Sequence, residues 1–216
     1  MNDFAGWFYT CGSALCHQLP DRSFFLSNMF LPVCARCAGI YIGASIGIFW
    51  MIFKGRFQAR YTFSKMFVGF IVLSELYLLT DWWVDWPLNI ARFSSGLVGG
   101  WAAALGVVSV LTFFLWKPEE QTIKKFGYQT VFIGIIILSI NVVFIILPSL
   151  ENIALFALWT LITFGVVGLF SVANSVMLLL IFDNLRHRVY RTKHLMQMLT
   201  TGLLMFLMEF AVVLSF

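Results

Sequence analysis

The chain has 216 residues, of which 61% are hydrophobic and 11% charged, with a net charge of +4 and a mean hydropathy of +0.91. Such a chain has too little polar surface to cover a water-soluble globule of its size, which excludes a soluble enzyme or binding domain. It carries no nucleic-acid-binding motif, and a basic surface of this kind is more typical of contact with anionic lipid headgroups.

Apolar stretches long enough to span about 30 Å of hydrocarbon define the predicted fold. They occur at residues 33–53, 64–84, 94–116, 127–147, 153–182 and 195–216. We therefore expect an all-α, polytopic membrane bundle with about six transmembrane helices. Residues 1–216 would form one membrane domain, in which residues 33–216 are the bundle and residues 1–32 an N-terminal, cysteine-rich interfacial cap and loop.

The positions of the basic residues predict the topology. Most of the 14 Lys and Arg residues lie in the connections at 54–65, 117–125 and 186–193, whereas the opposite side carries only Arg22, Arg36 and Arg92. Because basic loops resist translocation, the positive-inside rule places these connections in the cytoplasm. We expect a multi-pass protein of the cytoplasmic (inner) membrane, embedded in the lipid bilayer, with both termini outside. The sequence does not define an oligomeric state.

The first predicted span carries two separate patterns. Pro32 fits a first helical turn, where its missing N–H has no partner to lose, so we expect the helix to start there. Ala35, Gly39, Gly43 and Gly47 recur every four residues and predict a seam along which a neighbouring helix approaches closely. Upstream, apolar residues at helical spacing in residues 3–19 predict a short interfacial helix. Its predicted face contains Phe4, Trp7, Phe8, Cys11 and Leu15.

All four cysteines lie within the first 37 residues, as Cys11, a Cys16-His17 pair and a Cys34-Ala-Arg-Cys37 step at the start of the first span. A Cys-x-x-Cys step at a helix start offers two sulfurs on one edge, and a second pair upstream can complete a tetrahedral zinc site. The positive end of the helix dipole favours the thiolate form that a metal requires. We expect Cys16, Cys34 and Cys37 to bind zinc or a similar soft-ligand metal, with His17 or Cys11 as the fourth ligand.

Two sequence segments resemble a known family. CHQLPDRSF at 16–24 and LPVCARCAGIYIG at 31–43 are similar to the signature of the uncharacterised bacterial and archaeal membrane protein family DUF2085, and a looser match continues through Asp81, Asn89, Arg92 and Gly96. The resemblance implies that the Cys-His pair and the Cys-x-x-Cys pair form the family's signature site, of which Cys11 is not a part. It implies no reaction.

Two other uses of the same thiols compete with metal binding. Cys34-x-x-Cys37 at the outer end of a membrane helix also resembles membrane thiol-disulfide oxidoreductases that pass electrons from dithiols to a quinone. In that hypothesis Arg36 stabilises a thiolate and quinone is the cofactor. The third interpretation is structural, with two disulfides or buried thiols fixing the loop to the first span.

Further polar residues map to the same end of the bundle as the cysteines. If the metal keeps one position open to water, it would act as a Lewis acid on a lipid or amphipathic substrate, with Asp81 as candidate base and Arg22, Arg36 and Arg92 as anion clamps. Ionisable groups at membrane depth are usually paired, so we also expect Arg36 or Arg92 to pair with Asp81. If the metal is closed and structural, the protein would instead be a scaffold, a partner subunit or a small-solute or ion transporter.

Overall fold

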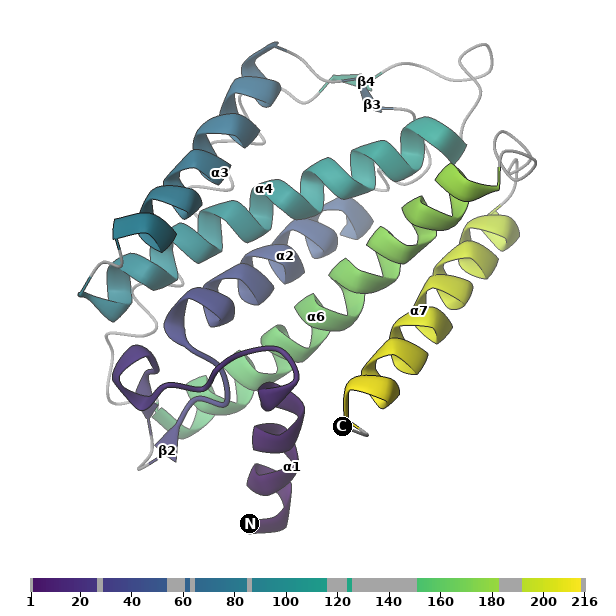
Figure 1. The fold of residues 1–216 in the computed structure, drawn as a ribbon. Coiled ribbons are helices and arrows are strands. Elements are labelled where there is room, and N and C mark those ends of the chain that lie inside the picture. Colours follow the sequence, from purple (N-terminus) through teal and green to yellow (C-terminus); the bar gives the residue numbers. More distant parts are fainter. Residues whose placement is uncertain are drawn as a thin grey trace.

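The fold was analysed in a computed structural model, which describes residues 2–26, 29–53, 61–62, 65–84, 87–115, 124–125, 151–182 and 192–214. Within these residues the long helices are α2 (Ala35–Phe53), α3 (Lys65–Val84), α4 (Asn89–Leu115), α6 (Glu151–Ile181) and α7 (Thr192–Leu214). A shorter helix, α1 (Asn2–Ser13), precedes them. In Figure 1, α2, α4 and α6 lie side by side and run in one direction, while α3 and α7 flank them and run in the other.

The fold confirms the expected all-α membrane bundle. In the part of the chain that the structure describes, four helical stretches are long and apolar enough to cross a bilayer, namely Ala35–Phe53, Asn89–Leu115, Ala157–Ile181 and Met196–Val213. The predicted span at 64–84 forms the 20-residue helix α3, which is not among these four stretches. The predicted span at 127–147 lies outside the described residues, so the number of six spans stays a prediction.

Glycines set how closely the three central helices pack. A Cβ added at Gly39 or Gly43 of α2 would overlap the carbonyl oxygens of Phe93 and Leu97 on α4. On the other side of α2, a Cβ at Gly165 of α6 would overlap the carbonyl oxygen of Tyr41. Backbones can approach this closely only where side chains are absent, which confirms the predicted small-residue seam and shows that α2 is packed between two neighbours.

The cap is the segment between α1 and α2, together with α1. It contains a short 3₁₀ turn, η1 (Pro20–Arg22), and an antiparallel pair of two-residue strands, β1 (Phe25–Leu26) and β2 (Met29–Phe30). Leu31 and Val33 are each 1% exposed and belong to one apolar cluster with Phe93 of α4 and Trp159 of α6. Burying these side chains fixes the cap onto the ends of the central helices.

The expectation that Pro32 starts the first span is wrong. The helix begins at Ala35, with Cys34 as the residue before its first turn, because the Cys34 carbonyl accepts the first helical hydrogen bond from the N–H of Ala38 at 2.9 Å. The Pro32 carbonyl is instead engaged by the side-chain amide of Gln18 at 3.0 Å, which holds residues 32–34 against the cap. The N-terminal helix predicted within residues 3–19 is α1, which ends at Ser13, so Leu15 of the predicted face lies beyond the helix.

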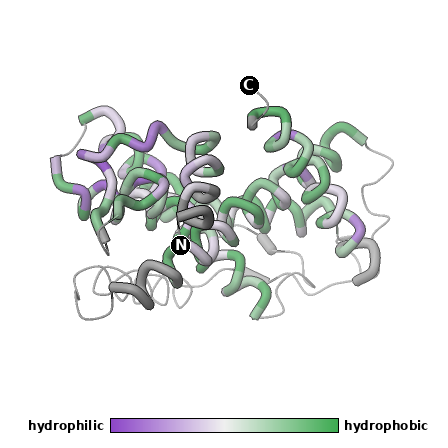
Figure 2. The backbone as a smooth tube through the Cα atoms, turned by 90° about the horizontal axis from the view of Figure 1, so that it is seen from below, coloured by the Kyte–Doolittle hydropathy of each residue, from purple (hydrophilic) through white to green (hydrophobic). Residues whose placement is uncertain are grey.

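The two ends of the bundle are formed by different elements. The cap, the start of α2, the end of α3 and the start of α4 lie at one end, which we call the cap end, and both chain termini point toward it (Figure 1). Figure 2 shows hydrophobic residues along the helices and hydrophilic ones gathered toward the ends. At the opposite end lies a short parallel strand pair, β3 (Tyr61–Thr62) with β4 (Lys124–Lys125). The side of the membrane that the cap end faces stays a prediction.

The packing of α2 predicts that bulk at Gly43 is not tolerated. We expect Gly43→Leu to lower the stability of the protein by at least the roughly 1–3 kcal/mol typical of overpacked cores, because the new side chain meets the α4 backbone rather than a movable side chain. Thermal unfolding of the purified protein in detergent measures this. The matched control is Gly69→Leu on α3, where nothing lies within 4 Å of an added Cβ. Equal melting temperatures for the two variants would contradict the close packing.

Candidate metal centre

The structure brings three of the four cysteines together. The sulfur atoms of Cys16, Cys34 and Cys37 all lie within 4.8 Å of one another, and each residue is half-buried. Cys34 immediately precedes α2 and Cys37 lies in its first turn, so the helix start presents both sulfurs on one side. Cys16 comes from the cap, 18 residues earlier in the sequence than Cys34. Two distant stretches therefore meet at the end of a membrane helix, as the sequence predicted.

Backbone hydrogen bonds hold Cys16 in place. Its Sγ accepts a hydrogen bond from the backbone N–H of Cys34 at 3.2 Å. The chain reverses after Cys16 through Gln18, whose φ of 51° lies in the left-handed region that non-glycine residues seldom adopt. The Gln18 amide donates hydrogen bonds to the carbonyls of Tyr9 at 2.6 Å and Pro32 at 3.0 Å. Gln18 thus links α1, the turn and the residues before α2, and it stabilises the geometry of the cluster.

The cluster favours a thiolate at Cys16. Hydrogen bonds from Cys34 and Cys37 to the Cys16 sulfur lower the pKa of Cys16 well below its ordinary value, whereas the pKa of Cys34 is raised because it donates to Cys16. All four cysteines are free thiols in the structure. Three sulfurs within 4.8 Å of one another, one of which accepts a backbone hydrogen bond, have the donor chemistry of a thiophilic metal site.

The two candidate fourth ligands lie apart from this cluster. Neither Cys11 nor His17 belongs to the group of described metal-ligating atoms within 4.8 Å of one another. His17 is exposed, and Cys11 is half-buried on α1, where burial raises the pKa of its thiol. Among the described residues, the cluster therefore contains three cysteine sulfurs and no fourth His, Cys, Asp or Glu atom within the same distance.

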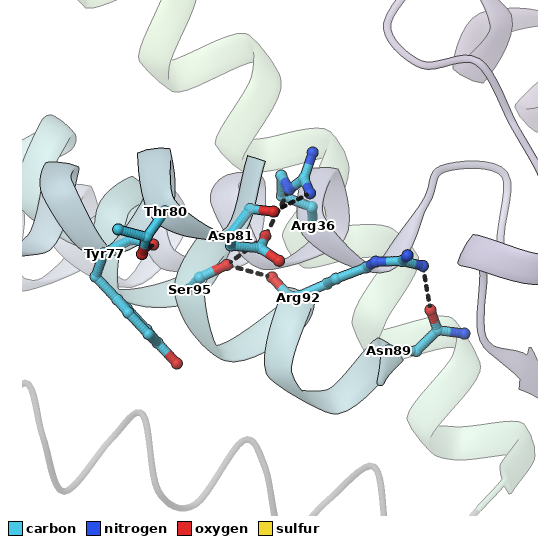
Figure 3. Close-up of polar contacts among 7 residues, drawn as sticks. All are labelled: Arg36, Tyr77, Thr80, Asp81, Asn89, Arg92 and Ser95. Atoms are coloured by element: carbon cyan, nitrogen blue, oxygen red, sulfur yellow. Dashed lines mark hydrogen bonds and ion pairs between the residues drawn. The ribbon is translucent and has the colours of Figure 1, made fainter. Parts of the chain in front are cut away.

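A second polar network joins the helix ends beside the cluster (Figure 3). Asp81 of α3 is 0% exposed, and its Oδ2 accepts hydrogen bonds from Nε of Arg36 at 2.6 Å and from the hydroxyl of Ser95 at 2.8 Å. Arg36 also donates to the Asp81 carbonyl at 3.2 Å. The expected ion pair is confirmed for Arg36, which lies next to Cys37 in sequence. The Arg36–Asp81 ion pair connects α2 to α3, and the hydrogen bond from Ser95 extends this network to α4.

Arg92 and Arg22 occupy other positions at the cap end. Arg92 donates to the Oδ1 of Asn89 at 3.2 Å, and Asn89 donates through Nδ2 to the carbonyls of Asp21 and Ser23 at 3.3 Å each. These bonds attach the cap to the start of α4. Arg22 Nε lies 3.9 Å from Asp21 Oδ2, and the Arg22 side chain is 38% exposed while that of Asp21 is 76% exposed. The roles of these arginines as anion clamps, and of Asp81 as a base, stay predictions.

Sequence reasoning missed two residues that build the site. Gln18 lies inside the CHQ segment, so the resemblance marked its position, but its bonds to Tyr9 and Pro32 depend on the fold of the cap. Ser95 was not among the predicted site residues. Its hydroxyl contact with Asp81 requires the register of α3 against α4, for which the sequence gives no signal.

Comparison with known proteins identifies the family. Residues 16–106 match the family model described as a predicted membrane protein, DUF2085, and this region contains the cysteine cluster and the Asp81 network. An uncharacterised protein of Methanocaldococcus jannaschii is 31% identical over 121 residues, which cover 50% of this chain and 71% of that relative. An uncharacterised protein of Methanothermobacter thermautotrophicus is 28% identical over 91 residues, covering 40% of this chain and 78% of the relative.

No solved structure matches the chain. On the family model and the archaeal relatives together, the chain belongs to the DUF2085 family of membrane proteins.

The buried ion pair gives a double-mutant prediction. We expect Arg36→Met to destabilise the protein by about 3–5 kcal/mol, because it leaves the Asp81 carboxylate buried without its partner. Adding Asp81→Leu to Arg36→Met should recover much of that loss, since both charges are then removed. Unfolding titrations of the wild type, both single variants and the double variant measure the coupling. A double variant whose loss equals the sum of the single losses would contradict the pairing.

Proposed function

We propose that the protein is a membrane metalloprotein in which Cys16, Cys34 and Cys37 bind one thiophilic ion, most simply Zn²⁺. The meeting of three sulfurs within 4.8 Å from two distant stretches is the single observation that carries this proposal. Zinc accepts thiolate ligands at about 2.3 Å in tetrahedral geometry, which places neighbouring sulfurs at roughly the separation found here. The helix start and the N–H of Cys34 supply the positive electrostatic field that three thiolates require.

The number of protein ligands at the proposed metal site favours a catalytic rather than a purely structural metal ion. Structural zinc sites are closed by four protein ligands, whereas catalytic zinc keeps three and leaves one position to water or substrate. Since Cys11 and His17 lie apart from the described cluster, we propose that the fourth position is open. An ion at such a position would act as a Lewis acid and lower the pKa of a bound water.

The surroundings favour a lipid or amphipathic substrate. The site lies at the end of a membrane-spanning helix, beside an arginine that the buried Asp81 carboxylate holds in place. We propose that Arg36 and the cap-end arginines Arg22 and Arg92 orient an anionic group. We assign Asp81 to fixing Arg36 rather than to proton transfer, because its Oδ2 is engaged by Arg36 and Ser95 and its side chain is fully buried. The cap end would face outward from the cytoplasmic membrane, by the distribution of basic loops.

Metal content tests the ligand set directly. We expect one zinc per chain in the wild type, at most one tenth of that in Cys16→Ser, Cys34→Ser and Cys37→Ser, and full content in Cys11→Ser and His17→Ala. Protons compete for the sulfurs, so the zinc content should also fall as the pH is lowered. Inductively coupled plasma mass spectrometry of the purified variants measures both. Full zinc content in the three cluster variants, or its loss in Cys11→Ser, would contradict the assignment.

Thiol-disulfide exchange is the second candidate, and the lowered pKa of Cys16 next to two other thiols favours it. Two cluster thiols would form one disulfide and pass two electrons and two protons to a quinone, giving the quinol. We expect this not to occur, because the bound ion masks the sulfurs. Incubation of Cys11→Ser with a soluble quinone, followed by thiol titration, should leave three thiols until a chelator is added. Loss of two thiols with equimolar quinol formation in zinc-loaded protein would favour exchange.

A further inference from the structure

A pocket of about 240 Å³ lies between the cap and helices α6 and α7. Cys11 and Leu15 contribute from the cap, Val166 from α6, and Phe206 and Phe210 from α7. None of its described lining residues carries a charged side chain, and the polar side-chain groups are the thiol of Cys11 and the hydroxyl of Thr163. A cavity with such walls has no means of recognising a charged or sugar-like ligand.

Two segments of the chain contribute residues both to the pocket and to the cysteine cluster. Leu15 lines the pocket and Cys16 belongs to the cluster, while Val33 lines the pocket and Cys34 belongs to the cluster. Pro32, whose carbonyl anchors Gln18, also lines the pocket. The same two segments therefore form an apolar wall and, one residue further along, the metal-binding sulfurs.

The pocket is continuous with the surface that faces lipid. Leu207 lines it and is 49% exposed, and its neighbours on α7, Leu204 and Met208, are 61% and 71% exposed. Only 11% of the Met196–Val213 span is buried inside the protein. Exposed apolar side chains on a membrane helix are in contact with hydrocarbon, so a chain can enter the pocket from the bilayer without crossing water.

We propose that this pocket binds one alkyl chain of a membrane amphiphile whose polar end lies at the cysteine cluster. The inference names the substrate class of the proposed metal site and rests on that function for its polar end. The apolar lining sets the chemistry of the chain, and the segments 15–16 and 33–34, which contribute to both the pocket and the cluster, direct its polar end toward the sulfurs.

Photolabelling tests the pocket. The purified protein in phosphatidylcholine nanodiscs is irradiated with a 16-carbon fatty acid that carries a diazirine at its methyl end, and labelled peptides are mapped by mass spectrometry. We expect the label to concentrate on the pocket-lining segments, residues 162–167 of α6 and 206–210 of α7. Thr163→Trp, which fills the pocket from its rim, should reduce this labelling at least fivefold. The matched control on the same helix is Met177→Trp, an exposed position outside the pocket, which should stay within twofold of the wild type.

Cys11 gives a second readout that needs no pocket variant. Its thiol lines the pocket, so the unlabelled fatty acid should slow its alkylation by an apolar maleimide several-fold in the wild-type protein, where mass spectrometry of the peptide that contains Cys11 follows the reaction. Labelling spread evenly over the exposed faces of α6 and α7, or alkylation of Cys11 unaffected by fatty acid, would overturn the proposal.

The zinc content of the same wild-type sample separates the two proposals. Pocket labelling in a protein that binds no zinc would leave the alkyl-chain site standing and refute the metal site. Stoichiometric zinc with diffuse labelling would refute the alkyl-chain site and leave the metal site standing.

Discussion

The close approach of α2 to α4 and α6 is the constraint on which the rest of the described structure depends. Glycines at 39, 43 and 165 remove the side chains that would separate these helices, so the backbones pack in direct contact. Lipid tails are as apolar as the helix side chains, so the hydrophobic effect does not drive helix association within the bilayer. Close packing is therefore a main source of the stability of the bundle. Because α2 is packed on both sides, the start of this helix is a rigid platform: it holds Cys34, Arg36 and Cys37 in fixed positions.

Polar contacts then attach the remaining parts to this platform. The Arg36–Asp81 pair connects α2 to α3, and Asn89 attaches the cap to α4. Leu31 and Val33 bury the cap against α4 and α6, and Gln18 holds the turn that presents Cys16. Apart from Gln18, these residues are distant from Cys16 in sequence, yet together they determine where its sulfur lies. The cluster is thus a consequence of the whole cap end rather than of the Cys-x-x-Cys step alone.

The sequence predicted the features that depend on periodicity and composition. Span positions, the small-residue seam and the juxtaposition of Cys16 with Cys34 and Cys37 follow from hydropathy, four-residue spacing and metal-ligand chemistry. It failed at Pro32, because a proline that fits a first helical turn also fits an extended segment held by Gln18. It left the choice between Arg36 and Arg92 open, since that choice depends on how α3 is rotated against α2 and α4. The 240 Å³ pocket arises between α1, α6 and α7 and has no signal in any one segment.

X-ray absorption at the zinc edge of the purified wild-type protein tests the central claim most directly. We expect three sulfur scatterers at about 2.3 Å and one oxygen or nitrogen at about 2.0–2.1 Å, as for three cysteines with a fourth position open to water. A first shell of nitrogen and oxygen alone would show that the cluster does not bind the ion, and a shell of four sulfurs would show that Cys11 closes the site.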